Sequence, residues 1–298
     1  MENYHNLLIE ATHKQISLNN EIEFQNEFLM KAPPVLWFGD NSNNKNKILT
    51  LGANPSREEF LSDNKNKTIE RLKNGYKPRY LKGKDARFRY LEKEENWNDI
   101  IENKTLRNEI ISSYNDYFKV NSYNKQNAYK WFGKENNGKE LSYNVEGFVN
   151  CFNSSFFNGN KKNQSIHIDL FPFSTVSDFK SILTQSEKHI FKDNWTKEFL
   201  DKLILEINPV KIIVFGRTNF NYLTKLLKIS DTGEEYFFNE ITENGSNSNA
   251  NYWCFDYMNI TVIGLSVNLG NPKGFSKVTL KNFGNTINKF LKNTYTKH

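Results

Sequence analysis

Residues 47–58, KILTLGANPSRE, decide the fold that this chain is expected to adopt. The run KILTL at their start is mostly apolar and strand-forming, which is typical of a short buried strand. Gly52 ends the run at a point where a residue without a side chain allows a sharp turn. Pro55 is expected at the first position of a following helix, where its missing N–H costs nothing. The sequence therefore predicts a strand, a tight turn that carries Asn54, and a helix.

Strand and helix patterns alternate along much of the remaining chain. Apolar runs predict further strands at residues 211–215 and 260–264, and alternating apolar and polar residues predict one at 165–169. Helical spacing of apolar residues predicts helices at residues 195–208 and 279–291, and one at 218–228 that Thr218 would cap. Because strands alternate with helices, we expect an α/β fold, namely a three-layer α/β/α sandwich around a central, mainly parallel sheet.

Three segments fall outside this alternation. Residues 1–32 show helical spacing before a Pro-Pro pair and predict a helical N-terminal extension. Residues 60–160 are rich in Tyr, Phe, Trp, Asn and Lys and predict a large, mostly helical insertion. Residues 242–251, TENGSNSNAN, are polar and predict a surface loop. We expect residues 1–298 to form a single domain with these additions, because α/β domains often reach this length.

The composition limits the classes of partner and cofactor. Lys and Arg number 40 against 34 Asp and Glu, and the net charge of +6 suits a polyanionic partner. The two cysteines, Cys151 and Cys254, are too few for a disulfide framework, a thiolate-held iron–sulfur cluster or a structural zinc site. The N-terminal residues do not resemble a signal peptide, and no apolar run reaches membrane-spanning length. A cytoplasmic protein that needs no metal or cofactor is expected.

Two strand ends carry the polar residues that predict a binding site. In an open α/β sheet, ligands bind beyond the carboxyl ends of the strands, which is where Asn54 and Asp169 are expected. The alternating pattern SIHID at residues 165–169 predicts that His167 and Asp169 share one face of their strand. His167 either hydrogen-bonds Asp169 or acts as an acid, or it is a satisfied structural histidine. A helix N-terminus after Asn54 would attract anions, so a nucleotide fits this edge of the sheet.

Basic and aromatic residues are interleaved at residues 71–89, RLKNGYKPRYLKGKDARFR. Eight of these residues are Lys or Arg, among them Arg79 and Arg87, and three are aromatic. One interpretation is a surface that follows a phosphate backbone and stacks on unpaired bases. The other is a solvated face whose Lys and Arg side chains cover apolar surface. The sequence leaves both interpretations open.

Four short segments resemble motifs of the uracil-DNA glycosylase superfamily. LGANPS at residues 51–56 is similar to the turn that presents a water-positioning Asp or Asn, and IHIDLFPF at 166–173 resembles the strand whose terminal amide contacts uracil. KIIVFGRTNF at 211–220 is similar to the penultimate strand and the helix after it. NPKGFSKVTL at 271–280 looks most like the closing motif of the mismatch-specific uracil/thymine branch. The resemblance implies the fold of that superfamily and a DNA partner whose target base is flipped out.

The resemblance also implies roles for individual residues. Asn54 would position the attacking water, Asp169 would contact the flipped base, and Asn271 would stand where other branches have a catalytic His. Phe275 would be the wedge inserted into the duplex and Lys277 a phosphate contact, although a lone Phe is more commonly a buried loop anchor. The remaining assignments are Ser56, His167 and Phe171 in the base pocket, and Lys273, Arg217, Arg79 and Arg87 as DNA contacts. Arg217 would alternatively cap the edge of the sheet.

Two departures from the superfamily pattern indicate a different base. The superfamily contacts uracil through an amide, whereas an ionised Asp169 offers only acceptors and would repel the O4 atom of uracil. It would accept from the N4 amine of a cytosine-type base and favour a ring protonated at N3. Ser56 is small where the uracil-specific branch has a Tyr that blocks the C5 position. Since removal of ordinary cytosine would damage the host genome, we expect a 5-substituted cytosine, such as the glucosylated hydroxymethylcytosine of bacteriophage DNA.

These observations predict a monofunctional DNA glycosylase that acts on double-stranded DNA with modified bases, leaves abasic sites and serves in anti-phage defence. One alternative is a uracil or mismatch repair glycosylase on host DNA. Another is a non-catalytic nucleic-acid-binding module, in which Asn54 is only a turn residue. The aromatic residue that stacks on the flipped base is expected among Phe60, Tyr80, Phe88 and Trp131.

Overall fold

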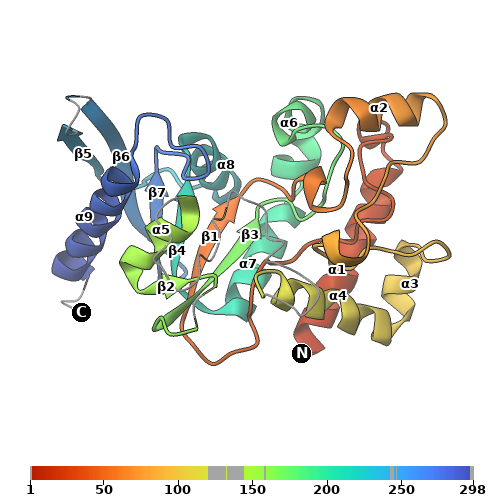
Figure 1. Ribbon diagram of the computed structural model, residues 1–298, viewed down its shortest axis with the longest axis horizontal. Helices are drawn as coiled ribbons and strands as arrows, with labels where there is room; N and C mark the ends of the chain where they lie inside the picture. The colour runs from red at the N-terminus through yellow and green to blue at the C-terminus, as the bar shows by residue number, and fades with distance from the viewer. Residues whose placement is uncertain are drawn as a thin grey trace. The chain divides into compact units, whose positions relative to one another are not determined.

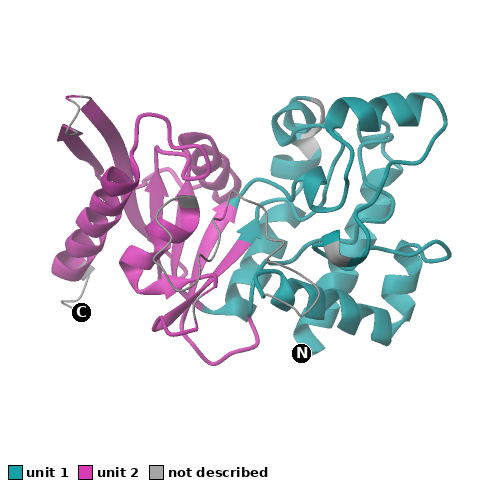
Figure 2. Cartoon of the chain, viewed as in Figure 1, with its two compact units in different colours: residues 1–40, 52–127, 168–208 teal, residues 41–51, 128–167, 209–298 magenta. Residues whose placement is uncertain are grey.

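The computed structural model describes residues 2–119, 132, 144–157, 159–241, 245 and 247–295 (Figure 1). The chain divides into two compact units (Figure 2). The first unit comprises residues 1–40, 52–127 and 168–208, and the second comprises residues 41–51, 128–167 and 209–298. Trp131, one of the candidates for stacking on a base, lies outside the described residues, as do parts of the segments 60–160 and 242–251.

Seven strands of the described chain form one mixed sheet. Their order is β2 (Ser154–Ser155), β3 (Asn163–Asp169), β1 (Lys47–Gly52), β4 (Pro209–Phe215), β7 (Ile260–Leu265), β6 (Asn247–Tyr257) and β5 (Glu235–Ile241). The pairs β2/β3, β1/β4 and β4/β7 are parallel, whereas β6 pairs antiparallel with β7 and β5. Gln164 N donates to Asn46 O, and Leu170 N donates to Gly52 O. Because the residue numbers rise in the same direction on both strands, β3 and β1 are parallel too. The sheet is therefore mainly parallel, as predicted.

The strands predicted from apolar runs are confirmed, and they are largely buried. All six residues of β1 are buried, and β4 is buried from Ile212 to Phe215. Residues 164–169 of β3 are also all buried, so the alternation in SIHID does not separate a covered face from an exposed one. Continuous β-branched runs are typical of parallel strands that are covered on both faces.

Helices cover both faces of the sheet in the second unit. The helices of this unit are α5 (Asn144–Val149), η4 (Asn150–Phe152), α8 (Arg217–Leu227) and α9 (Lys277–Tyr295). Successive strand residues point to opposite faces, as Tyr252 and Trp253 of β6 do. The Trp253 ring stacks on Phe220 of α8 with 4.9 Å between ring centroids, and Tyr252 contacts Phe283 of α9 at 6.1 Å. With α5 packed beside α9, the result is the expected three-layer sandwich (Figure 1).

The antiparallel strands β5 and β6 are not predicted by the sequence. Residues 247–251 were expected in a surface loop, but they begin β6, so this prediction is wrong. Ser248 and Ala250 are buried whereas Asn247 and Asn249 are exposed, and this alternation allows a polar segment to form a strand. Such one-sided strands are common in antiparallel pairs.

The first unit is mainly helical. Its helices are α1 (Glu2–Asn19), η1 (Ile22–Phe24), η2 (Arg57–Glu59), α2 (Lys65–Lys73), η3 (Gly83–Asp85), α3 (Trp97–Glu102), α4 (Lys104–Asp116), α6 (Phe179–Glu187), η5 (Lys188–Lys192) and α7 (Trp195–Ile207). α1 packs against α3, α4 and α7, and the rings of Phe24, Phe28, Phe171 and Phe173 form an aromatic core. The described part of residues 60–160, which are expected to be mostly helical, contains α2, η3, α3, α4, α5 and η4. None of the described helices combines the length and the apolar character that a bilayer crossing requires.

Two helices begin at residues other than those predicted. α8 has Gly216 as its N-cap residue with a φ of +88°, a conformation that glycine adopts readily, so Thr218 does not cap this helix. The short helix η2 follows Ser56, whose hydroxyl accepts from Glu58 N at 3.2 Å. Ser56 is therefore the N-cap residue, and its hydroxyl satisfies the N–H of Glu58 in the first turn. Pro55 lies before this N-cap and not at the first helical position.

Candidate functional site

The turn after β1 lies beside the segment that follows β3. The N–H groups of the two residues after Asp169 donate to the carbonyl oxygens of Gly52, at 3.1 Å, and Ala53, at 2.9 Å. These bonds continue the parallel pairing past the ends of both strands. The first unit consequently contains both Asn54, on the turn, and Asp169, the last residue of β3.

The side-chain amide of Asn54 is fixed in one orientation. Its Nδ2 atom donates to the carbonyl oxygen of Phe173 at 3.3 Å and to Thr175 Oγ1 at 3.0 Å. The Thr175 hydroxyl donates in turn to the carbonyl oxygen of Ser177 at 2.8 Å. Because a carbonyl oxygen only accepts hydrogen bonds, the NH2 group must face Phe173. The Oδ1 atom of this half-buried residue is left without a hydrogen-bond partner among the described residues.

A second carboxyl group, that of Glu59, accompanies Asp169 in the first unit. Glu59 is 3% exposed and Asp169 is 6% exposed. Tyr117 OH donates to Glu59 Oε2 at 2.8 Å, and Arg87 Nη1 lies 3.5 Å from the same oxygen. Arg87 Nη1 also donates to the carbonyl oxygen of Glu58 at 2.7 Å. The guanidinium group of Arg87 is therefore directed into this buried cluster.

Burial raises the pKa of Glu59 from its ordinary value of 4.5 to about 7, because the charged form is poorly solvated inside the protein. The Arg87 guanidinium and the Tyr117 hydroxyl lower the pKa and offset part of this effect. The negative charge of Asp169 raises the pKa further. Glu59 therefore gains or loses its proton close to neutral pH, and it interacts electrostatically with Asp169.

Aromatic rings pack around Tyr117. Phe60 and Phe88, two of the candidates for stacking on a base, are both buried and stack on each other with 5.6 Å between ring centroids. Phe88 also stacks on Tyr117 at 4.8 Å. Arg87, Phe88 and Tyr117 line a cavity of about 300 Å³ in the first unit. The partners of Glu59 are thus packed on one side and open to a cavity on the other.

The three residues assigned to the base pocket lie in different surroundings. Ser56 is exposed and caps η2, whereas Phe171 is fully buried in the aromatic core. His167 belongs to the second unit and is 3% exposed. Its Nδ1 atom lies 2.9 Å from Thr50 Oγ1, and its ring stacks on Phe215 at 6.0 Å. These contacts are those of a structural histidine.

The residues of the closing motif also belong to the second unit, on α9 and the loop before it. Three of its polar residues are exposed, namely Asn271, Lys273 and Lys277. Phe275 is half-buried, and its ring packs near Phe238 at 6.3 Å and Phe283 at 6.0 Å. The geometry of Phe275 matches the loop-anchor interpretation.

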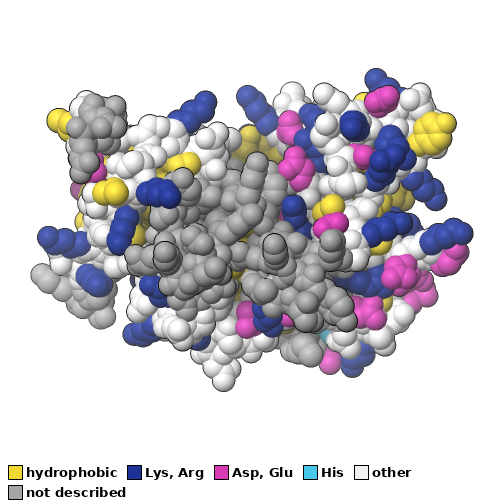
Figure 3. Space-filling view, in the orientation of Figure 1, with side chains coloured by type: hydrophobic (Ala, Val, Ile, Leu, Met, Phe, Trp, Pro, Cys, Tyr) yellow, Lys and Arg dark blue, Asp and Glu magenta, His cyan; other side chains and the backbone are white. Residues whose placement is uncertain are grey.

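The two other arginines assigned to DNA contact differ in their pairing. Arg217 Nη2 lies 2.9 Å from Glu235 Oε1, and its guanidinium lies over the Trp253 ring at 4.7 Å. These contacts tie α8 to β5 and β6 and fit a cap on the edge of the sheet. Arg79 is exposed, and within the described ranges its guanidinium has no acidic partner. It follows α2 in a part of the first unit where Figure 3 shows Lys and Arg side chains gathered.

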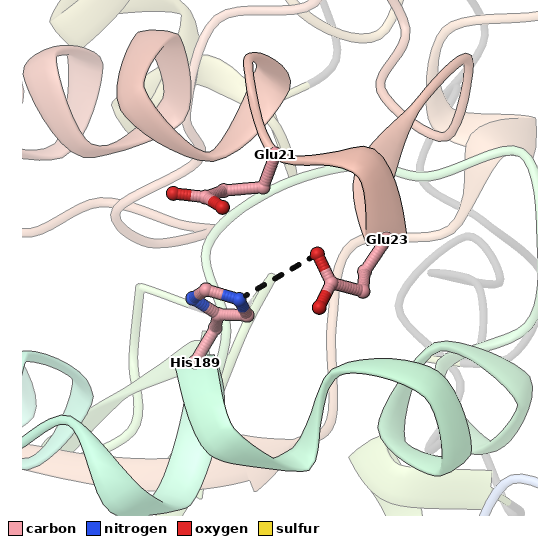
Figure 4. A group of neighbouring side chains, drawn as sticks. All are labelled: Glu21, Glu23 and His189. Carbon is pink, nitrogen blue, oxygen red and sulfur yellow. Dashed lines mark ion pairs between the residues drawn. The ribbon is translucent and has the colours of Figure 1, made fainter.

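Potential metal ligands occur elsewhere in the first unit. Figure 4 shows the side chains of Glu21, Glu23 and His189 directed toward one another from η1, the residue before it, and η5. Their ligand atoms lie within 4.8 Å of one another, and His189 Nε2 lies 3.9 Å from Glu23 Oε2. Imidazole and carboxylate groups are suitable ligands for several divalent metals. This group includes neither Asn54 nor Asp169 and is therefore separate from the candidate site.

No sequence pattern singles out Glu59, Tyr117 or Thr175. Glu59 stands in the polar run SREE, which gives no sign of burial, and its partners come from distant parts of the chain. Thr175 follows the apolar run FPF, and nothing in that pattern indicates a contact with Asn54. Comparisons of the chain with protein-family models, with curated proteins and with solved structures found no match.

Proposed function

We propose that this protein is a monofunctional DNA N-glycosylase that excises a flipped pyrimidine by hydrolysis. The observation that carries the proposal is the anchored amide of Asn54. Its carbonyl oxygen, which no described residue hydrogen-bonds, is directed away from Phe173 and Thr175. Cleavage of an N-glycosidic bond leaves an oxocarbenium-like sugar, so the attacking water needs positioning more than it needs deprotonation. A fixed carbonyl oxygen is suited to accept a hydrogen bond from that water.

The favoured substrate is a 5-substituted cytosine. An ionised Asp169 would accept from the N4 amine of such a base and would repel the O4 atom of uracil. Ser56 is small and exposed, which leaves room for a group on C5. An enzyme that spares ordinary cytosine and attacks the substituted bases of bacteriophage DNA would serve as an anti-phage defence in the cytoplasm.

The DNA partner would be double-stranded. The net charge of +6 favours a polyanion, and the exposed ammonium groups of Lys273 and Lys277 are suited to approach phosphates. Asn271, which is also exposed, would contribute a neutral donor beside the departing base or the orphan base. No step of this reaction requires a metal or cofactor.

The direct test is to incubate the purified protein with modified phage DNA and with unmodified DNA, and to count alkali-labile abasic sites. Asn54→Ala should lower base release by at least about 100-fold, because the water loses its positioning group, while DNA affinity stays unchanged. Asn98→Ala, on an exposed residue of α3, is the matched control. Full turnover by Asn54→Ala would move the water-positioning role to another residue.

A second variant tests the choice of base. Asp169→Asn keeps the size of the side chain and supplies an NH2 donor, so the preference should shift toward uracil, whose O4 atom accepts. An unchanged substrate spectrum would refute the base-contacting role of Asp169. Wild-type release of uracil without release of modified cytosine would support host repair instead. Binding without abasic sites on any DNA would support a non-catalytic nucleic-acid-binding module.

A further inference from the structure

A basic groove lies on the first unit, apart from Asn54 and Asp169. Its volume is about 770 Å³, and it follows the end of α2 and the chain after it. Six lining residues are basic, namely Lys31, Arg71, Lys77, Arg79, Lys82 and Lys93, and two are acidic, Asp85 and Glu92. Six positive charges against two negative charges leave a net charge of +4 along the groove. Such a concentration attracts a polyanion.

The groove is preformed by backbone hydrogen bonds. Ser62 N donates to Arg79 O at 2.9 Å, and Leu81 N donates to Phe60 O at 2.8 Å, so the two segments are paired. The carboxylate of Asp63 accepts from Arg79 N at 2.9 Å. A groove with a fixed backbone loses little conformational freedom when a ligand binds.

Three of the cations in the groove are available for a ligand. Lys31 Nζ donates to the carbonyl oxygen of Glu92 at 2.6 Å, and Arg71 Nε lies 3.5 Å from Asp63 Oδ2. In contrast, the exposed side chains of Lys77, Arg79 and Lys82 make no ion pair or hydrogen bond with the described part of the chain. These three residues follow one another along a single segment, as contacts to successive phosphates would require. We refer to Lys77, Arg79 and Lys82 as the groove cations.

An exposed aromatic ring stands next to the groove cations. Tyr76 is 64% exposed, directly before Lys77 in the chain. The guanidinium of Arg71 lies 5.9 Å from the centroid of its ring, which is cation–π geometry. A large exposed ring beside the groove cations is the combination that binds unpaired bases and their phosphates together.

We propose that this groove binds a single strand of nucleic acid, with phosphates on the groove cations and a base stacked on Tyr76. A single strand is favoured over a duplex because only unpaired bases offer their faces to an aromatic side chain. The inference rests on the proposed function for the identity of the strand as DNA. It does not depend on base excision, because it concerns binding alone.

The test measures the affinity of a short fluorescein-labelled oligothymidylate by fluorescence anisotropy over a range of salt concentrations. Lys77→Gln, Arg79→Gln and Lys82→Gln combined should weaken binding and reduce the slope of log affinity against log salt by about 2, at roughly 0.7 for each phosphate that is no longer neutralised. The matched control is Lys104→Gln, Lys180→Gln and Lys202→Gln combined, which removes three charges from exposed lysines elsewhere on the first unit.

A second variant separates stacking from charge. Tyr76→Ala should weaken binding by roughly 5-fold to 150-fold without changing the salt slope, and Tyr76→Phe should restore it. Wild-type affinity and salt slope in the groove triple variant would overturn the proposal. Equal affinity for a hairpin duplex, together with no effect of Tyr76→Ala, would overturn the single-strand assignment. Abasic-site counts by the wild-type protein on modified DNA test the proposed function separately, because binding of the oligothymidylate succeeds or fails whether or not a base is excised.

Discussion

Replacing Glu59 with Gln is expected to change how the stability of the protein depends on pH. In the folded protein this carboxyl group is buried, and its pKa is raised from 4.5 to about 7, chiefly by burial. In the unfolded chain the group is solvated and returns to its ordinary pKa. Folding therefore favours the protonated form. The contribution of Glu59 to stability is fully present below pH 4.5 and is lost as the pH rises through about 7.

The magnitude follows from the size of the pKa shift. At 1.36 kcal/mol per pKa unit, a rise in pKa from 4.5 to about 7 corresponds to a loss of about 3 kcal/mol in the free energy of unfolding. The loss is complete at a pH where Glu59 is ionised in both the folded and the unfolded states. Gln does not ionise, has nearly the same size and can still accept a hydrogen bond from Tyr117. Between about pH 5 and about pH 8, the free energy of unfolding of Glu59→Gln should therefore rise by about 2–3 kcal/mol relative to wild type.

Urea unfolding followed by tryptophan fluorescence at a series of pH values measures this difference. Glu58→Gln is the matched control, because it makes the same substitution at the neighbouring, less buried carboxyl group. Tyr117→Phe removes a hydroxyl that lowers the pKa of Glu59, so it should move the pH-dependent window upward. Stability curves for Glu59→Gln and wild type that run parallel from acid to alkaline pH would refute the reasoning.

Two further substitutions test the packing of the sheet and the anchoring of the amide. Gly264→Ala would place a Cβ atom 2.3 Å from two ring atoms of Phe220, so we expect a loss of about 1–3 kcal/mol in the free energy of unfolding, whereas Gly159→Ala, with open space around it, should be close to neutral. Thr175→Val removes the hydroxyl that accepts from Asn54 and should slow base release by up to about 100-fold with unchanged DNA affinity, and Thr175→Ser should restore the rate. Wild-type turnover by Thr175→Val would show that the Thr175 hydroxyl is not needed to hold the Asn54 amide in place.

The parallel strands could be predicted because buried strands have a recognisable local pattern of apolar residues. KIIVF and KILTL are mostly apolar, as is typical of strands covered on both faces, and both form strands. The edge strands β5 and β6 could not be predicted in this way. The exposed residues at the start of β6, Asn247 and Asn249, are polar, so the segment at residues 247–251 resembles a loop until its pairing with β5 is known.

The candidate site shows the same division. Asn54 and Asp169 could be placed at strand ends because a strand and its end are local features. Glu59 could not be identified, because its burial depends on contacts with Arg87 and Tyr117 that are distant in sequence. Local patterns thus locate the polar groups at the edge of the sheet, whereas their electrostatic surroundings are set by the tertiary fold.

The anchored NH2 group of Asn54 restricts what this residue could contribute during turnover. Both of its hydrogens are donated to neighbouring oxygens, so the group cannot donate a hydrogen bond to the departing pyrimidine. A carboxamide also takes up no proton near neutrality. Asn54 would therefore take no part in proton transfer during hydrolysis. The proton lost by the attacking water would pass to the leaving base or to bulk solvent.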